Sequence, residues 1–349
     1  MKGLTTVATH RSLGCDGTYR LAQGFGPLWT LVLLLGACQA STDASAGGDA
    51  TDAAAVGARL DAELSESFRP YPAEGRLFAV EGLMGPEAVK YDPDQDVYFI
   101  SSFGENEPGD ANDGFISRAA AEDGSMESYR WAVGQENWPL LDPRGMALAG
   151  DSLWVADANG LHAFHRITGA QLHFVDLTHL DPGFLNDVVV GQDGAVYVTD
   201  TFSSRVIRLH VGGDGGEVVA EGEILGSPNG ITPEPGTGRF ILVPWSGGDS
   251  LRAWEPTTGN VEMVARTPGG RFDGVEYLHG VMVVASQQDS ALHVVRSDAD
   301  AGVPYQKVPG SPADIAVDTR RNRVAVPYIR LNRVDVFPGV GVEREILRP

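Results

Sequence analysis

From Phe68 onward, short runs of apolar, β-branched and aromatic residues alternate with turns rich in Gly, Pro, Asn and Asp. This alternation contains no amphipathic helical pattern longer than two turns, so it predicts an all-β domain over residues 68–349. Residues 39–67 differ, because they are rich in Ala, Gly and Asp and poor in large apolar side chains. That composition is typical of a flexible tether.

One phrase recurs six times in the β region. It consists of a turn, a variable residue, a small residue or Asp, an apolar run, a second turn and a second apolar strand. Residues 86–89 before residues 97–100 are one example, and residues 228–231 before residues 240–243 are another. We call the variable position the column, and its members in order are Glu87, Arg144, Asn186, Asn229, Asp273 and Ala313.

The spacing of the column predicts the architecture. Successive members are 57, 42, 43, 44 and 40 residues apart, and an insertion over residues 103–114 explains the long first step. A period of about 40–45 residues in an all-β chain is typical of four-stranded propeller blades. We therefore predict a six-bladed β-propeller around a central channel. Because an open sheet edge promotes aggregation, a terminal strand must close the ring, and residues 77–80 and 342–347 are the two candidates.

The first 38 residues are similar to an export signal. Basic residues precede an apolar stretch over residues 28–35, and Gly36 and Ala37 lead into Cys38. This order resembles a bacterial lipoprotein signal, in which Cys38 carries the lipid and becomes the first mature residue. An ordinary cleaved signal and a single membrane anchor are the alternatives. We expect an exported cell-envelope lipoprotein, on the periplasmic face of a membrane or the cell surface, that meets the membrane only through Cys38.

Composition and charge limit the partners. The chain carries 26 Lys and Arg against 47 Asp and Glu, which gives a formal net charge of −21. Loss of residues 1–37 would remove Cys15, three basic residues and one acidic residue, giving −23 and leaving lipidated Cys38 as the one cysteine. This excludes disulfides, thiolate zinc sites and a cysteine nucleophile. Such a negative surface repels nucleic acid and favours cations or neutral molecules, so we expect a monomer that binds a small-molecule substrate and no nucleic acid.

Four members of the column carry oxygen donors: Glu87, Asn186, Asn229 and Asp273. They hold equivalent positions in blades one, three, four and five, so propeller symmetry would bring them to a common point near the axis. Two carboxylates and two amide oxygens suit a hard divalent cation, and calcium accepts such a mixed shell more readily than magnesium. Each residue alone is more often a turn former. Four in one register predict a Ca²⁺ site, with another hard divalent cation as the alternative.

Four short motifs resemble the calcium-binding motifs of gluconolactonase/regucalcin-like propellers, paraoxonases and diisopropylfluorophosphatase. They are Gly85-Pro86-Glu87, Leu185-Asn186-Asp187, Pro228-Asn229-Gly230 and Asp273-Gly274. The resemblance covers about residues 75–338 and implies that Glu87, Asn186, Asn229 and Asp273 bind a catalytic calcium. Regucalcin-like enzymes take a ligand Asp from the end of a second strand in the fourth blade. This chain has Trp245 there, so it is more similar to the paraoxonase pattern. Residues 311–315 do not match the His-bearing loops of these enzymes, which argues against a histidine base.

The ends of the second strands should surround the predicted metal. Arg144 fills the column in blade two and would contact either the acids or a substrate carbonyl or carboxylate. An apolar wall beside a charged centre suits a small neutral ester or lactone, although aromatic residues that only cap the channel are the alternative. Asp187 lies beside a predicted ligand and would orient it, so Asp187 and Asp273 are the predicted catalytic residues. The predicted substrate pocket contains Arg144, Phe103, Asp157, Asp200, Trp245, Gln287 and Tyr328.

Two functions from different classes fit this site. The first is a calcium-dependent hydrolase of a lactone, ester or phosphotriester, in which the metal polarises a carbonyl or phosphoryl oxygen. Either a metal-bound water or the Asp273 carboxylate would then attack. The second is a non-catalytic cell-envelope propeller that binds a ligand or protein partner and uses calcium to stiffen its channel. We favour the enzyme.

Overall fold

The structure is a computed structural model that describes residues 75–105, 112–209, 215–246, 248–296 and 299–340. The chain divides into two compact units, Met1–Ala58 and Arg59–Pro349, and all described residues belong to the second. The predicted signal peptide (1–38) and tether (39–67) lie outside the described residues. Among the residues that are described, the structure contains no helix long and apolar enough to cross a membrane.

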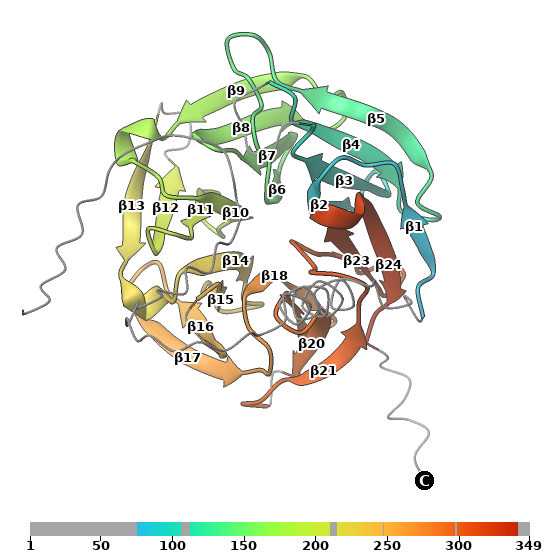
Figure 1. The fold of residues 1–349 in the computed structure, drawn as a ribbon. Coiled ribbons are helices and arrows are strands. Elements are labelled where there is room, and N and C mark those ends of the chain that lie inside the picture. The colour runs from blue at the N-terminus through green and yellow to red at the C-terminus, as the bar shows by residue number, and fades with distance from the viewer. Residues whose placement is uncertain (1–74, 106–111, 210–214, 247, 297–298, 341–349) are drawn as a thin grey trace, which may run out of the picture. The chain divides into compact units, whose positions relative to one another are not determined.

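The second unit is built from six antiparallel sheets of four strands each, which stand around a common centre (Figure 1). This arrangement confirms the six-bladed β-propeller that the column spacing predicts. In the first five blades, the four strands pair in chain order, starting from the innermost strand. Such neighbour pairing follows from the short turns between successive strands.

The blades have the following strands. Blade one contains β2 (Pro86–Asp92), β3 (Val97–Ser102), β4 (Phe115–Ala120) and β5 (Met126–Val133). Blade two contains β6 (Met146–Ala149), β7 (Ser152–Ala156), β8 (Gly160–His165) and β9 (Gln171–Asp176). Blade three contains β10 (Leu185–Val190), β11 (Val196–Asp200), β12 (Arg205–Leu209) and β13 (Gly216–Glu221). Blade four contains β14 (Pro228–Pro233), β15 (Phe240–Pro244), β16 (Ser250–Trp254) and β17 (Val261–Arg266). Blade five contains β18 (Phe272–Leu278), β19 (Val281–Ser286), β20 (Ala291–Arg296) and β21 (Val303–Lys307). Short 3-10 helices precede β10, β14 and β24, namely η1 (Thr178–Leu180), η2 (Glu223–Leu225) and η3 (Ile329–Leu331).

Blade six joins the two ends of the β region. It contains β22 (Ala316–Asp318), β23 (Arg323–Tyr328), β24 (Arg333–Pro338) and, outermost, β1 (Phe78–Val80). β1 pairs antiparallel with β24, and an ion pair of 3.1 Å between Arg76 and Asp335 lies beside this pairing. The candidate closing strand over residues 77–80 is therefore confirmed. The competing candidate, residues 342–347, lies outside the described residues.

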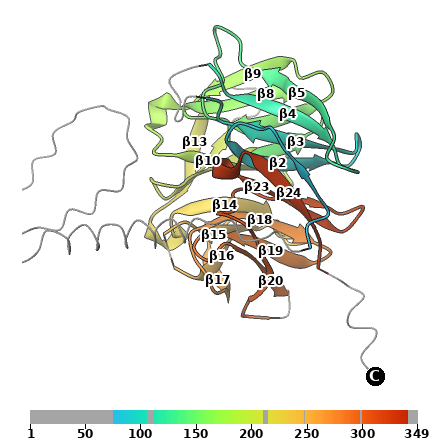
Figure 2. The ribbon, with the colours of Figure 1, turned by 45° about the vertical axis from the view of Figure 1, so that its right-hand side comes forward.

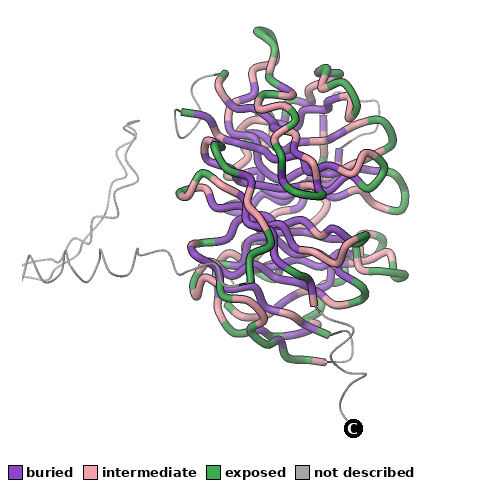
Figure 3. The backbone as a smooth tube through the Cα atoms, turned by 90° about the vertical axis from the view of Figure 1, so that its right-hand side faces the viewer, coloured by how far each residue is buried: buried purple, intermediate pink, exposed green. Residues whose placement is uncertain are grey.

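The hydrophobic core is divided among the spaces between neighbouring blades. Blades one and two, for example, share a cluster that includes Phe99, Ile116 and Met146. Strands near the centre of the ring, such as β2 and β3, are buried on both faces, whereas outermost strands such as β5 alternate with solvent (Figure 2, Figure 3). Burial of this apolar surface, worth about 25 cal/mol per Å², fixes the blades against each other and so fixes the inner strand of each.

Candidate metal centre

A β-bulge lies at the column in each of the four blades that carry an oxygen donor there. The pairing between the inner and second strands shifts register between Pro86 and Val89, between Leu185 and Val188, between Pro228 and Ile231, and between Phe272 and Val275. A bulge inserts an extra residue into one strand and re-aims its side chains. The column residue of each of these blades is one of the residues inside the bulge.

Blades two and six have inner strands that begin later. Their inner strands begin only at Met146 and Ala316, after Arg144 and Ala313. The backbone N–H of Arg144 donates to Ala156 O at 2.9 Å, and that of Ala313 donates to Pro327 O at 3.0 Å. Because Met146 pairs with Val155 and Ala316 pairs with Ala325, the pairing shifts by one position at the column in these two blades as well.

Small residues after the column let neighbouring inner strands approach closely. A Cβ on Gly145 would lie 2.5 Å from Asp187 Cα, which is closer than such atoms can pack. A Cβ on Gly230 would overlap the carbonyl oxygen of Asp273, and one on Gly274 would overlap the backbone nitrogen of Ile315. Neighbouring inner strands are therefore in close contact at the level of the column.

The four predicted ligands are buried and incompletely satisfied. Their exposed fractions are 4% for Glu87, 2% for Asn186, 2% for Asn229 and 4% for Asp273. Within the described residues, one oxygen of each has no hydrogen-bond partner: Glu87 Oε2, Asn186 Oδ1, Asn229 Oδ1 and Asp273 Oδ1. Leaving such an oxygen unpaired costs about 1–3 kcal/mol, so four at equivalent positions require an explanation. The donor set, two carboxylates and two amides, fits a hard cation.

No group of three or more His, Cys, Asp or Glu in the described part of the chain is arranged to hold a metal. The candidate set is consistent with this finding, because only Glu87 and Asp273 among its four members are acidic. Amide oxygens supply the other half of the shell, as calcium permits.

Electrostatic coupling connects the two acidic members. Burial raises the pKa of Glu87 above its usual range, and the charge of Asp273 raises it further. Burial and the charge of Asp187 raise the pKa of Asp273 to about 7, although a hydrogen bond from Gln287 opposes this shift. Glu87 and Asp273 belong to blades one and five, which are not neighbours. Their interaction therefore acts across the channel.

Gln287 orients the Asp273 carboxylate. Its Nε2 donates a hydrogen bond of 2.6 Å to Asp273 Oδ2, while Asp273 Oδ1 keeps no partner in the described structure. Gln287 directly follows β19, the strand that pairs with β18. The sequence placed Gln287 near the site, and the structure gives it this specific contact.

Arg144 is buried at the edge of blade three. Its Nη1 donates to Leu185 O at 2.9 Å, its Nη2 donates to Asp142 Oδ2 at 3.3 Å, and its guanidinium lies 4.0 Å from the ring centre of Phe184. Burial lowers its pKa, and its charge in turn lowers the pKa of Glu87. The Nε has no hydrogen-bond partner among the described residues. Arg144 therefore places positive charge beside the carboxylates.

Asp187 ties two inner strands together. Its Oδ2 accepts a hydrogen bond of 2.8 Å from the backbone N–H of Ile231 in blade four, and its Oδ1 accepts one of 2.7 Å from that of Val188. Burial raises its pKa to about 7, against the effect of the Ile231 amide. Both oxygens are thus engaged with backbone, so the contacts seen here support an orienting role beside Asn186. The predicted catalytic role of Asp187 stays a prediction.

An ion pair crosses the channel three residues after the column. The sequence pattern did not predict it. Lys90 Nζ in blade one lies 2.6 Å from Glu276 Oε1 in blade five, and Thr232 in blade four donates to Glu276 Oε2 at 3.2 Å. Glu276 raises the pKa of Lys90, against the effect of burial. Comparison of the residues three positions after each column member could have found this pair, because it sets a Lys against a Glu.

Asp157 and Asp200 are fully buried and hold loops. Asp157 Oδ2 accepts a hydrogen bond of 2.9 Å from the N–H of Leu141, in the loop that leads to Arg144. Asp200 Oδ1 accepts one of 2.8 Å from the N–H of Phe184, two residues before Asn186, and Asp200 also pairs with Arg205 at 2.6 Å. These carboxylates therefore hold the loops that lead to the column residues Arg144 and Asn186.

The three predicted aromatic residues occupy different places. Phe103 and Trp245 are half-buried, and their N–H groups donate to the carbonyls of Gly85 and Ser227, each two residues before a column member. Both residues are therefore tied to the loops that enter the column. Tyr328 is 1% exposed and packs in the core that blades five and six share, where burial and nearby Asp335 raise its pKa.

No family model matches the chain, and no curated protein matches it. Its fold is similar to that of solved structures. A gluconolactonase from Xanthomonas campestris, described as important in glucose secondary metabolic pathways, is 17% identical, with a TM-score of 0.58 over 77% of this chain and 94% of that one. A streptogramin B lyase is 14% identical, with a TM-score of 0.52 over 76% and 99% of the two chains. A catalytically inactive virginiamycin B lyase from Staphylococcus aureus, solved with quinupristin, is 14% identical, with a TM-score of 0.52 over 74% and 98%. At these identities the similarity shows the fold alone: this chain is a six-bladed β-propeller, an architecture that it shares with a gluconolactonase and with streptogramin lyases.

Proposed function

We propose that this protein is a calcium-dependent hydrolase of lactones, esters or phosphotriesters. The supporting observation is the set of four buried side-chain oxygens that lack a partner among the described residues, one in each of four equivalent bulges. In this proposal Glu87, Asn186, Asn229 and Asp273 hold the cation. The resemblance of their sequence motifs to those of calcium-dependent propeller hydrolases favours the same activity.

Calcium held there would act as a Lewis acid on a carbonyl or phosphoryl oxygen of the substrate. The side chains around the cation would orient the Asp273 carboxylate and bind a substrate oxygen. Gln287 holds Asp273 Oδ2, which leaves Oδ1 as the oxygen that would face the cation. Arg144, whose charge acts on Glu87, provides a positive group for a substrate oxygen. Burial of the site strengthens both interactions, because charges attract more strongly where water is excluded.

Two routes of attack are compatible with these positions. In one, the Asp273 carboxylate attacks the substrate carbon or phosphorus and displaces the leaving group, and water then attacks Asp273 Cγ and frees the product. In the other, a water molecule attacks directly and Asp273 acts only as a ligand. A single turnover in ¹⁸O-water distinguishes them: the first route places the label in the Asp273 carboxylate and leaves the product unlabelled, whereas the second places the label in the product.

The proposal is tested with the purified mature chain on a panel of lactones, aryl esters and phosphotriesters, with calcium or with EDTA. We expect turnover on at least one class, loss of turnover with EDTA, and recovery when calcium is restored. Asp273→Asn should lower calcium affinity by at least ~100-fold, since it removes the charge of a direct ligand. No turnover on any class, or turnover indifferent to EDTA, would sink the proposal.

Asp318→Asn is the matched control for the loss of a buried carboxylate. Asp318 is fully buried in β22, and its Oδ1 accepts hydrogen bonds from the backbone N–H groups of Arg320 and Arg321. It ends the strand rather than beginning it. This substitution should lower stability and leave calcium affinity unchanged.

A structural role for calcium is the alternative. The four oxygens belong to four blades, so a cation among them would also stiffen the channel of a non-catalytic propeller that binds a ligand or protein partner. A rise in melting temperature with calcium, together with no turnover across the panel, would favour this second function.

A further inference from the structure

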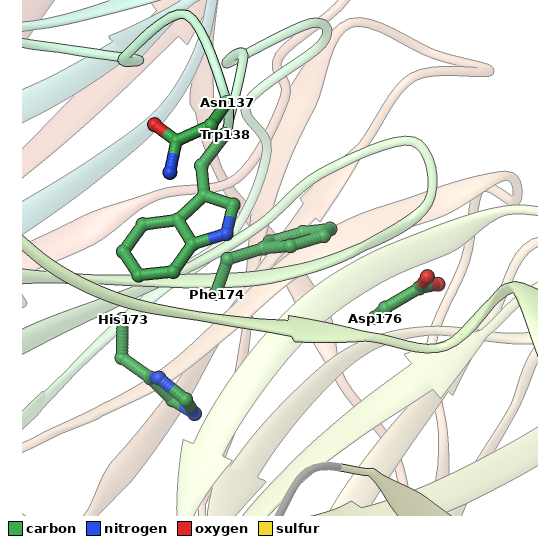
Figure 4. A pocket seen from close by; sticks show the side chains of 5 residues that line it. All are labelled: Asn137, Trp138, His173, Phe174 and Asp176. Carbon is green, nitrogen blue, oxygen red and sulfur yellow. The ribbon is translucent and has the colours of Figure 1, made fainter.

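A pocket of about 410 Å³ lies on blade two, away from the column. Its lining combines aromatic rings with polar groups (Figure 4). Three of the lining residues belong to β9, the outermost strand of the blade, and two belong to the segment between β5 and β6. The volume lies in the range of small-molecule sites, about 300–1,000 Å³. The lining residues are Asn137, Trp138, His173, Phe174 and Asp176.

Hydrogen bonds hold the turn that carries Trp138 in place. Gln135 and Trp138 form an isolated backbone bridge, in which the Trp138 N–H donates to Gln135 O at 3.1 Å. The buried side chain of Gln171 spans this turn: its Oε1 accepts from Gln135 N at 2.9 Å, and its Nε2 donates to Trp138 O at 3.1 Å. The backbone that carries the indole is therefore held before any ligand binds.

The same network supports the second aromatic wall. Gln171 Nε2 also lies 2.7 Å from His162 Nδ1, and His162 Nε2 lies 3.1 Å from Asp157 Oδ2. With His162 protonated on Nε2 alone, every one of these contacts joins a donor to an acceptor. The ring of Phe174 stacks on His162 with centroids 4.5 Å apart. His162 is fully buried, and the proposed hydrolysis gives it no role.

The chemistry of the lining indicates the class of ligand. A sugar ring has an apolar C–H face, which packs on an aromatic ring, and a rim of hydroxyls, which need donors and acceptors. Trp138 and Phe174 supply the first, and Asn137, His173 and Asp176 supply the second. The Asp176 carboxylate is held by hydrogen bonds from Thr178 N at 2.8 Å and Thr178 Oγ1 at 2.6 Å. Asp176 and the net charge of −21 disfavour an anionic ligand.

We propose that this pocket binds a neutral saccharide, with Trp138 packed on the sugar ring and Asn137 and Asp176 bound to its hydroxyls. A small organic cation is the competing ligand, because aromatic rings beside a carboxylate also suit a quaternary ammonium group. The saccharide is favoured because it engages the uncharged amide of Asn137, which a cation does not need. This site is independent of the proposed hydrolase activity.

The test is isothermal titration of the mature chain with methyl glycosides of glucose, galactose, mannose and N-acetylglucosamine, with their dimers, and with choline. We expect at least one saccharide to bind with a Kd near ~1 mM or below. Trp138→Ala should weaken that binding at least ~10-fold. Gln171→Leu, which removes the support of the turn without touching the ligand, should weaken it as well.

Leu172→Ala is the matched control, because Leu172 is exposed on the same strand and does not line the pocket. It should leave saccharide binding unchanged. If Trp138→Ala does not fold, protection of Trp138 from oxidation by N-bromosuccinimide in the unaltered chain replaces it. Binding of choline without any saccharide, binding of neither, or saccharide binding that survives loss of Trp138 would each overturn the proposal.

Discussion

At the scale of single residues, the two carboxylate oxygens of Asp273 have different surroundings. Its Oδ2 is held by Gln287, whereas its Oδ1 is buried without a partner in the described structure. An amide donor suits this task, since it stabilises the carboxylate without supplying a charge that would compete with a cation. A group that orients a ligand in this way commonly changes metal affinity when it is removed.

Gln287→Met should therefore weaken calcium binding by about 10–100-fold while leaving the fold intact, because it keeps the length of the side chain and removes the donor. Calcium titration by calorimetry measures the effect, and circular dichroism checks the fold. Gln288→Met is the control, since Gln288 is the exposed neighbour and forms no hydrogen bond with Asp273 in the described structure. Equal calcium affinity of Gln287→Met and the unaltered chain would contradict the orienting role.

Several residues near the column show the limits of the sequence pattern. Three of them lie at a strand end or just after one, which suggested a position at the rim of the pocket. They are Asp157, Asp200 and Tyr328. The structure instead directs both carboxylates to loop N–H groups and packs Tyr328 in the core. The direction of a side chain at a strand end depends on the geometry of the following turn, and residue spacing does not encode that geometry.

At the scale of elements, the inner strands combine a bulge with a small residue after it. The strands themselves were predictable, because alternating apolar runs and turn residues mark them in the chain. The bulges were not, since a bulge is a register shift between two strands and leaves no sign in either strand alone. The glycines gave an indirect signal: Gly145, Gly230 and Gly274 occupy the same place in the phrase, where a Cβ has no room.

Gly230→Ala should lower the free energy of unfolding by at least ~3 kcal/mol, because its Cβ would overlap the backbone of Asp273 and force blades four and five apart. Chemical denaturation measures this loss. Gly280→Ala provides the comparison: no atom lies near its Cβ, so only its positive φ of 82° opposes the change, at a cost of about 1 kcal/mol. Similar losses for the two variants would contradict the crowding at the column.

At the scale of the whole molecule, the buried carboxylates should make metal-free stability depend on pH. The pKa values of Asp187 and Asp273 are raised to about 7, against about 3.9 for a free Asp. Between these values the folded protein binds more protons than the unfolded chain, so its free energy of unfolding falls as pH rises. The metal-free protein should melt at a lower temperature at pH 8 than at pH 5.

Calcium should reverse this trend. The cation competes with protons for the same oxygens, so its stabilising effect grows as pH rises from 5 to 8. Thermal melts with calcium and with EGTA across this range measure both effects. A calcium-induced increase in melting temperature that is larger at pH 5 than at pH 8 would contradict the assignment of the ligands.

The closing strand provides a further prediction. A chain that begins at Leu83 lacks β1, so it leaves the backbone groups of β24 unpaired and removes the Arg76 partner of Asp335. We expect a lower melting temperature and self-association through the exposed edge, which light scattering after gel filtration detects. A chain that begins at residue 75 is the control. Monomeric behaviour and an unchanged melting temperature for the shorter chain would contradict the role of β1.

The pairing of β1 with β24 also has a consequence for the order of folding. Arg76 and Asp335 are 259 positions apart, and joining such distant segments costs about 3 kcal/mol more chain entropy than closing a hairpin of about ten residues. Blades one to five are each built from consecutive strands, so they can form locally as the chain is made. Blade six cannot be completed until β24 is available. The ring should therefore become whole late, in a slow final step that begins only when the two ends of the propeller meet.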